Sequence, residues 1–361
     1  MIKLRKNLAQ YQENFFLLFV LALGFLMSMG LESQDRPYRI VFAIVSVCWA
    51  LKMFSTDFTL REIIWMIVIT LFLGVNFLAN HEKTLILTAM GIFSAKNMSL
   101  EKVFKYGFWS KFAATASTIL LAAVGIIENL SVTLPKNGVM LQFNCYGYGH
   151  PNITFGNIVL VFILAILAYK DKLKWYVYLL FTLILFGAYQ LLMSRTGLVV
   201  WGCLMIMLVC YKLSLKWKLD KIYLSLFCIL PVLLAVITCA VTVFSINNPA
   251  FSARINFYLT GRINLIIGAL GNMGNILLGQ VPRHMFDNLN FYLLYNYGIV
   301  ILLFSLLSYT YAMWVCLKQK RHYEVIILGA IVIFGFMEYY VASIAWNLSL
   351  LCLSRVLFKE E

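Results

Sequence analysis

The sequence predicts an all-α integral membrane protein with about twelve transmembrane helices, and three observations lead to this fold class. Of the 361 residues, 62% are hydrophobic and only 12% are charged. Apolar runs of about twenty residues, the length that an α-helix needs to cross a bilayer, recur from one end of the chain to the other. These runs lack the period-2 alternation of a transmembrane β-barrel. We therefore expect the whole chain, 1–361, to form a single polytopic membrane domain.

The expected spans follow one another along the chain, the fourth is short, and the last two are barely separated. They cover roughly 15–30, 38–54, 63–79, 84–95, 109–127, 156–169, 175–193, 197–211, 222–245, 290–316, 324–340 and 341–356. Two of the connections expected on the outer side are long, at about 128–155 and 246–289. Long loops on a helical scaffold are where functional residues tend to lie.

The net charge of +14 follows the pattern of membrane topology and gives no support to nucleic-acid binding. With the N-terminus in the cytoplasm, 21 of the 29 basic residues fall in cytoplasmic segments, Lys52, Lys96 and Lys111 among them. An excess of Lys and Arg on the cytoplasmic side is what fixes the orientation of multi-pass proteins. Both termini are therefore expected in the cytoplasm, and no nucleic-acid partner is expected.

The basic residues on the outer side differ in kind from those inside. Six of the eight are arginines, although lysines outnumber arginines in the whole chain; the eight are Arg36, Arg39, Lys83, Lys136, Arg195, Arg254, Arg262 and Arg283. Topology requires only positive charge, whereas the planar guanidinium fork of arginine suits bidentate binding of phosphate. The outer arginines are thus a candidate anion site.

Three segments supply the arginines of this candidate site. Arg195 lies in Leu192-Met193-Ser194-Arg195-Thr196-Gly197, between two apolar spans with almost no loop, where its alternative role is to snorkel at a hairpin tip. Arg254 and Arg262 are eight residues apart; on one helix both would face one way, about 12 Å apart. Their alternative role is to hold lipid headgroups from an interfacial amphipathic helix. Arg283 lies just before a span.

Titratable residues near these arginines are candidates for a general base. His284 and Asp287 precede the span that begins near residue 290, and His150 lies in the turn Gly149-His150-Pro151-Asn152. The alternative for Asp287 is a helix cap. The alternative for His150 is a turn histidine whose ring is hydrogen-bonded to the backbone.

On these motifs the chain resembles the O-antigen and capsular polysaccharide polymerase (Wzy) family, within the superfamily that includes the O-antigen ligases. Gly149-His150-Pro151-Asn152 resembles the family's His-Pro-Asn turn, and Ser194-Arg195-Thr196-Gly197 resembles its Ser-Arg-Gly-like hairpin. The run from Asp287-Asn288 through Tyr292-Leu293 to Gly298 resembles a third family motif. Ligase-like members tend to have His where this chain has Asp287, so the base remains open among His284, Asp287 and His150.

The resemblance implies a GT-C type glycosyltransferase of the bacterial inner or plasma membrane with a large outer loop. Such a polymerase transfers glycan from a polyprenyl diphosphate carrier to a carrier-linked repeat unit on the outer leaflet, by an inverting route that needs no metal or other cofactor. Arg195, Arg254, Arg262 and Arg283 would then bind the diphosphate. The expected partners are the lipid-linked donor and acceptor, membrane lipid, and, as a further partner that the resemblance allows, a protein that regulates chain length.

Two other hypotheses for the function remain open. A ligase would use the same chemistry on a different acceptor. A flippase or transporter for lipid-linked oligosaccharide would need ionisable residues near midspan. Glu338, near the outer end of its expected span, is the main acid within the spans.

Overall fold

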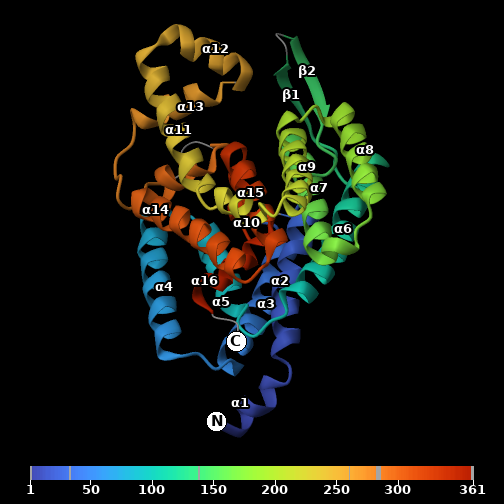
Figure 1. Ribbon diagram of the computed structural model, residues 1–361, viewed down its shortest axis with the longest axis vertical. Helices are drawn as coiled ribbons and strands as arrows, with labels where there is room; N and C mark the ends of the chain where they lie inside the picture. Colours follow the sequence, from blue (N-terminus) through green and yellow to red (C-terminus); the bar gives the residue numbers. More distant parts are fainter. Residues whose placement is uncertain (1, 32–33, 137–138, 260, 282–285, 359–361) are drawn as a thin grey trace. The chain divides into compact units, whose positions relative to one another are not determined.

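The computed structural model describes residues 2–31, 34–136, 139–259, 261–281 and 286–358, and most of them are helical (Figure 1). The elements of the first half of the chain are α1 Ile2–Ala9, α2 Gln12–Ser28, α3 Arg36–Ser55, α4 Leu60–Asn80, α5 Thr84–Ser94, α6 Leu100–Ala123, β1 Ser131–Lys136, β2 Val139–Asn144, α7 Pro151–Tyr169 and the 3-10 helix η1 Lys170–Lys172. The second half holds α8 Trp175–Leu192, α9 Arg195–Lys216, α10 Asp220–Phe227, α11 Leu230–Asn247, α12 Pro249–Leu259, α13 Arg262–Leu270, α14 Leu289–Lys318, α15 His322–Met337, η2 Tyr339–Ala342, η3 Leu348–Leu353 and α16 Ser354–Leu357.

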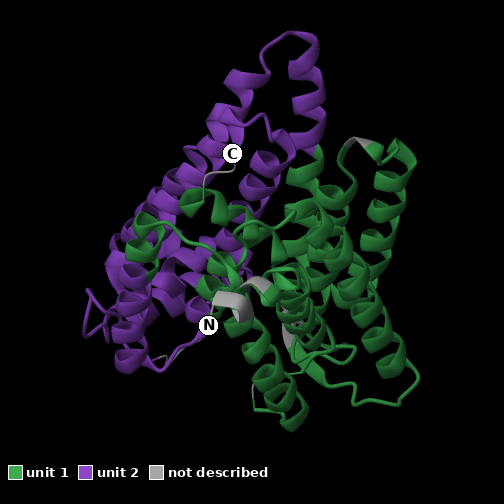
Figure 2. Cartoon of the chain, turned by 90° about the horizontal axis from the view of Figure 1, so that it is seen from below, with its two compact units in different colours: residues 1–66, 87–205, 343–361 green, residues 67–86, 206–342 purple. Residues whose placement is uncertain are grey.

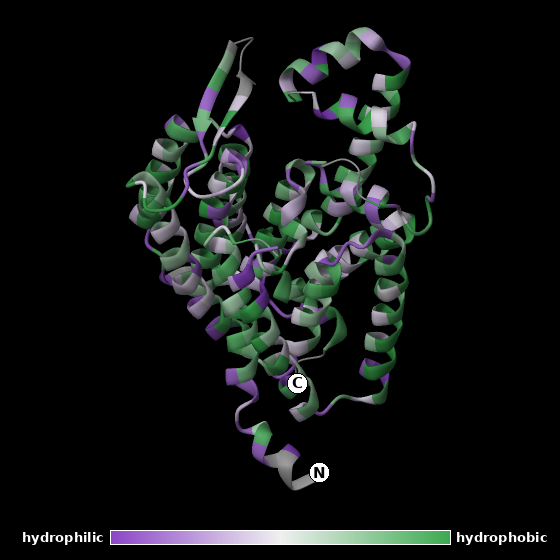
Figure 3. Cartoon of the chain, turned by 180° about the vertical axis from the view of Figure 1, so that it is seen from behind, coloured by the Kyte–Doolittle hydropathy of each residue, from purple (hydrophilic) through white to green (hydrophobic). Residues whose placement is uncertain are grey.

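Seven helices in the described part of the chain are long and apolar enough to cross a membrane: α3, α4, α7, α8, α9, α11 and α14. Hydrophobic residues cover most of these helices (Figure 3). Four shorter apolar segments accompany them, Gln12–Ser28, Thr84–Ser94, His322–Met337 and Leu348–Leu357. The chain is therefore a helical, membrane-embedded protein as the sequence predicts, while the count of about twelve spans is not confirmed.

The last expected span, 341–356, is not a continuous helix. Two 3-10 segments, η2 and η3, precede the four-residue α16, and non-helical backbone separates η2 from η3. The Asn347 side chain accepts a hydrogen bond from the Ser349 backbone N–H at 3.2 Å. Such a local side-chain bond competes with the α-helical pattern, so an apolar run long enough for a span is broken into short turns.

A β-hairpin lies within the first long connection, where no strand was predicted. β1 and β2 pair antiparallel from Ser131 opposite Asn144 to Lys136 opposite Val139. Each strand is only six residues long, and alternation over so few residues is a weak signal in a chain dominated by apolar helices.

The chain divides into two compact units (Figure 2). Unit 1 comprises residues 1–66, 87–205 and 343–361, and unit 2 comprises residues 67–86 and 206–342. In unit 1, α6 packs against both α2 and α7, and α7 is buried along nearly its whole length. In unit 2, α14 packs against α11 and α15, and α15 is mostly buried.

Helix α14 is interrupted at Gly298, which has a positive φ of 85°. A Cβ at this position would lie 2.1 Å from the carbonyl oxygen of Leu277, so only glycine allows the segment before the helix to approach so closely. The Asn76 side chain of α4 donates to the Tyr297 carbonyl at 3.0 Å, and the Ile299 N–H donates to the Ile276 carbonyl at 2.8 Å. The polar groups freed by the break are thus bonded within unit 2.

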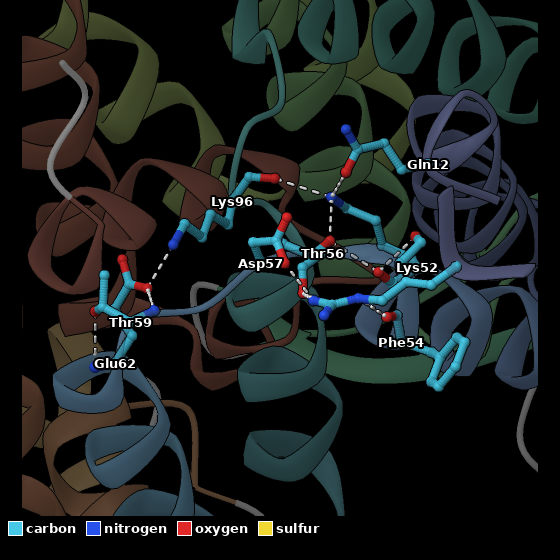
Figure 4. A network of polar contacts seen from close by, with 10 residues as sticks. Gln12, Lys52, Phe54, Thr56, Asp57, Thr59, Glu62 and Lys96 are labelled. Carbon is cyan, nitrogen blue, oxygen red and sulfur yellow. Dashed lines mark hydrogen bonds and ion pairs between the residues drawn. The ribbon is translucent and has the colours of Figure 1, made fainter. Parts of the chain in front are cut away.

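Several basic residues assigned to topology also hold unit 1 together (Figure 4). The buried Lys52 ammonium donates to Gln12 Oε1 at 3.2 Å, to Thr56 Oγ1 at 2.8 Å and to the Lys96 carbonyl at 2.9 Å. Lys96 in turn pairs with Glu62 at 2.5 Å. These bonds join the starts of α2 and α4 to the end of α3.

Lys111 departs from its expected place in a cytoplasmic segment. It lies in the middle of α6, and its side chain is 0% exposed. A single helix from Leu100 to Ala123 replaces the cytoplasmic stretch and the span that were expected to meet there. Lys111 therefore contributes a charge to the interior of unit 1.

Candidate functional site

The start of α9 places Arg195 at a tight junction between two long helices. Met193 ends α8 in the left-handed conformation, with φ 50° and ψ 28°, and α9 begins at Arg195. Arg195 is exposed at the first helical position. Ser194, immediately before it, is only 1% exposed, and its hydroxyl has no hydrogen-bond partner among the described residues. A serine at this position ordinarily caps its helix, so its hydroxyl and the first backbone N–H groups of α9 form an incomplete polar cluster.

Gly197 brings the start of α9 against the start of α7. A Cβ on Gly197 would lie 2.0 Å from Cδ1 of the buried Phe155 ring. Both helices begin within a few residues of this contact. The turn that holds His150 and the hairpin that holds Arg195 therefore belong to the same end of unit 1.

His150 caps α7. Its Nδ1 accepts the backbone N–H of Asn152 at 3.1 Å, and Pro151 occupies the first helical position. The backbone hydrogen bond expected for a turn histidine is therefore present. Because Nδ1 accepts, the neutral ring carries its proton on Nε2. The role of His150 as a base stays a prediction.

Arg254 and Arg262 do not share a helix. The expected continuous helix is broken, since α12 ends at Leu259 and α13 begins at Arg262. Gly261 between them adopts a left-handed conformation with φ 82°, which ends one helix and redirects the chain into the next. The expectation that both arginines face one way along one helix is wrong. Arg254 lies exposed on α12.

Arg262 is the centre of an ionic cluster in unit 2. Its Nε lies 2.7 Å from Asp287 Oδ2, and one terminal nitrogen lies 3.3 Å from Glu338 Oε1. The other terminal nitrogen donates to the Met337 carbonyl at 3.0 Å. The Arg262 side chain is 22% exposed, that of Asp287 36% and that of Glu338 only 4%. The sequence indicated Glu338 only as an acid near the end of a span, and its role as partner of Arg262 was missed.

Asp287 is not the cap of α14. The neighbouring Asn288 takes this role, because its Oδ1 accepts the Phe291 N–H at 3.0 Å. Its Nδ2 also donates to the Phe336 carbonyl at 2.9 Å, which fastens the start of α14 to the end of α15. The cap interpretation of Asp287 is therefore wrong, and its carboxylate bonds to Arg262 instead. His284 and Arg283, the remaining candidates of this segment, lie outside the described residues.

The structure thus brings together one pair of the predicted site residues, Arg262 and Asp287, and divides the rest between the units. Unit 1 holds His150 and Arg195, and unit 2 holds Arg254, Arg262 and Asp287. Within the described ranges, no three His, Cys, Asp or Glu side chains gather closely enough to hold a metal ion.

The start of α9 has the chemistry of an anion site, because helix N-termini carry unbonded N–H groups and partial positive charge. In the Arg262 cluster, two carboxylates already neutralise the guanidinium. This arrangement suits a carboxylate held in one orientation for proton transfer better than it suits an anion site. Comparison of the chain with protein families, with curated proteins and with solved structures gave no significant match.

Proposed function

We propose that this protein is a glycosyltransferase that polymerises carrier-linked repeat units, transferring glycan from a polyprenyl diphosphate donor to the repeat unit on a second carrier. The proposal combines the motif resemblance with one structural observation, the incomplete polar cluster at the start of α9. A lipid diphosphate is a leaving group that carries growing negative charge. A site for it needs donors that are already in place before the reaction.

Three features of the α9 start support its assignment to the diphosphate. The 22-residue helix α9 begins directly after Ser194, so its first backbone N–H groups lie at this end of the helix. The Ser194 hydroxyl is buried without a partner among the described residues. The guanidinium of Arg195 adds charge at the first helical position. The left-handed Met193 is a strained conformation for a side chain with a Cβ, and such conformations cluster at functional sites.

The Arg262 cluster supports the role of Asp287 as the base that takes the proton of the acceptor hydroxyl. A carboxylate with a guanidinium at 2.7 Å is held in one orientation. It is also partly exposed, so an acceptor hydroxyl can reach it. In this assignment Arg262 orients the base, and Arg195 carries the larger share of diphosphate binding. Each part belongs to its own unit and is tested by itself.

Binding of undecaprenyl diphosphate to the purified protein in lipid nanodiscs tests the first part. We expect Arg195→Ala to weaken binding at least about tenfold, the usual scale for one charged hydrogen-bonding group. Arg36→Ala is a matched control, because Arg36 is also an exposed first residue of a long helix. It follows the carboxylate of Asp35, which disfavours an anion there, so its loss should leave the affinity unchanged.

Glycan analysis in cells tests the activity. After deletion of the gene, the wild-type gene should restore a ladder of polymers, whereas Arg195→Ala and Asp287→Asn should leave single repeat units. A full ladder from the Arg195→Ala variant would contradict the diphosphate assignment. A polymer that is made but not joined to its final acceptor would point to the ligase alternative.

A further inference from the structure

Lys111 is a cation in the interior of unit 1 whose partners are all neutral. Its ammonium donates to Ser28 Oγ at 2.5 Å, to the Gly24 carbonyl at 3.4 Å and to the Ala345 carbonyl at 3.5 Å. It also lies 5.8 Å from the centre of the Trp346 ring. No carboxylate of the described residues forms an ion pair with it. A buried charge without a counterion is expensive, and within membrane segments such residues mark a function by default.

The position of the charge explains how it is tolerated. α2 ends at Ser28, and the last carbonyls of a helix carry partial negative charge. Lys111 from α6 reaches this end of α2 and the chain at residues 345–346 at the same time. In place of a carboxylate, the ammonium has one carbonyl of α2, the Ser28 hydroxyl and the Ala345 carbonyl as partners, and it joins three segments that are far apart in sequence.

The same end of α2 also contacts the loop 145–150, which is expected on the outer side. The Tyr148 hydroxyl donates to the Ser28 carbonyl at 2.5 Å, and Thr118 of α6 donates to this carbonyl at 3.2 Å. Asn157 of α7 donates to the Tyr148 oxygen at 2.9 Å. Burial raises the pKa of Tyr148 to about 12, so its hydroxyl stays protonated and remains a donor.

A second contact presses the loop onto the chain that follows α2. A Cβ on Gly30 would clash with the Gly147 carbonyl oxygen, at 2.4 Å, and Gly30 has a φ of 74°. Cys145, at the beginning of the loop, is 0% exposed, and its carbonyl accepts the Thr154 hydroxyl at 2.6 Å. The loop 145–150 is therefore fixed between the end of α2 and the start of α7.

We propose that Lys111 is a positioning residue: through Ser28 its charge holds the outer loop 145–150, and with it His150, in place. The placement of the loop stands on the contacts alone, whereas its consequence for glycan transfer rests on the proposed function. Lys52 provides the contrast within the same unit. It is also buried among neutral acceptors, but its bonds join the start of α2, the end of α3 and the Lys96 carbonyl, none of which belongs to this loop.

The thiol of Cys145 provides the readout. Cys145 is fully buried, and this burial raises the pKa of its thiol. A maleimide therefore reacts with the thiol only when the loop opens. In the purified full-length protein, Lys111→Met should speed labelling of Cys145 by about tenfold, as expected for the loss of one strong buried hydrogen bond. Tyr148→Phe should speed it by a similar factor. The double variant should be no faster than the faster single variant, because both residues act through Ser28.

Two controls separate loop opening from general loss of structure. Lys105→Met removes an exposed lysine from the same helix and should leave the Cys145 rate unchanged. Labelling of the buried Cys316 and Cys352, read in the same digest, should stay slow in every variant. If Lys111→Met folds poorly, Ser28→Ala removes the hydroxyl acceptor alone and should give the same Cys145 effect. An unchanged Cys145 rate in both Lys111→Met and Ser28→Ala would overturn the proposal, and so would equal acceleration at all three cysteines.

The functional consequence has a separate measurement. Lys111→Met should lower the turnover of glycan transfer at least about tenfold and leave the affinity for undecaprenyl diphosphate within about twofold. Equal losses in turnover and affinity would overturn the positioning role in catalysis. If the wild-type protein binds no undecaprenyl diphosphate, the proposed function fails, while the labelling of Cys145 still decides whether Lys111 holds the loop.

Discussion

Arg262 bonds to two carboxylates and a backbone carbonyl at once, which limits what its charge can do elsewhere. A guanidinium whose charge is neutralised by two carboxylates attracts a diphosphate only weakly. The sequence alone predicted Arg195, Arg254, Arg262 and Arg283 as phosphate ligands. In the structure, Arg262 pairs with Asp287 and Glu338, so its charge is held by carboxylates within unit 2.

We expect Arg262→Met to destabilise the protein by up to about 3 kcal/mol, because it leaves the buried Glu338 carboxylate without its cation. Arg262→Met combined with Glu338→Gln should recover a large part of this loss. Thermal unfolding in detergent measures both effects. The Glu338 side chain is only 4% exposed, so solvent has little access to its carboxylate once Arg262 is removed. An Arg262→Met variant as stable as the wild type would contradict this prediction.

At the scale of elements, the close approach of α7 and α9 depends on one glycine. Gly197 has no side chain to separate α9 from the Phe155 ring. Gly202, on the same helix, has open space around its Cβ position. The two positions therefore form a matched pair.

Gly197→Ala should destabilise the protein by about 1–3 kcal/mol, because the Phe155 ring must move from a packed position. Gly202→Ala should be neutral or stabilising by up to about 1 kcal/mol, since alanine favours helix more than glycine does. Unfolding in detergent compares them directly. Equal effects of the two substitutions would argue against the contact between α9 and α7.

The break in α14 makes a second prediction at this scale. Asn76→Leu removes the donor to the Tyr297 carbonyl and leaves that buried group without its partner from α4. The expected loss of stability is about 1–3 kcal/mol. Gly74→Ala is the control on α4, because nothing lies within 4 Å of the Cβ position. Hydrogen exchange at residues 295–299 should rise in Asn76→Leu alone; equal exchange in both variants would contradict a local role for Asn76.

At the scale of the whole molecule, orientation follows from the charge distribution in the sequence. The hairpin of β1 and β2 is expected on the outer side, and the end of α9 on the cytoplasmic side. The burial of Lys111 takes one charge out of this count and leaves the lysine-rich segments expected on the cytoplasmic side, such as 212–221, unchanged.

Labelling in intact cells tests this orientation. A membrane-impermeant maleimide should label Asn144→Cys in intact cells and Lys216→Cys only after permeabilisation, because both positions are exposed but lie on opposite sides of the membrane in the expected topology. Labelling of Lys216→Cys from outside would reverse the assignment. The outer placement of Arg195 would then fail with it.

Sequence by itself determined the helical membrane class, the places where most long helices begin and end, and the turns at His150 and Arg195. These depend on local composition, on apolar length and on turn residues such as Pro151, all of which act within a few positions. The tertiary structure decided that Arg262 pairs with Asp287 and Glu338, that Asn288 rather than Asp287 caps α14, and that Lys111 is buried against the end of α2. Each of these depends on side chains that fold to a few ångströms from one another, some of them across tens or hundreds of positions, and periodicity and composition carry no information about such distances.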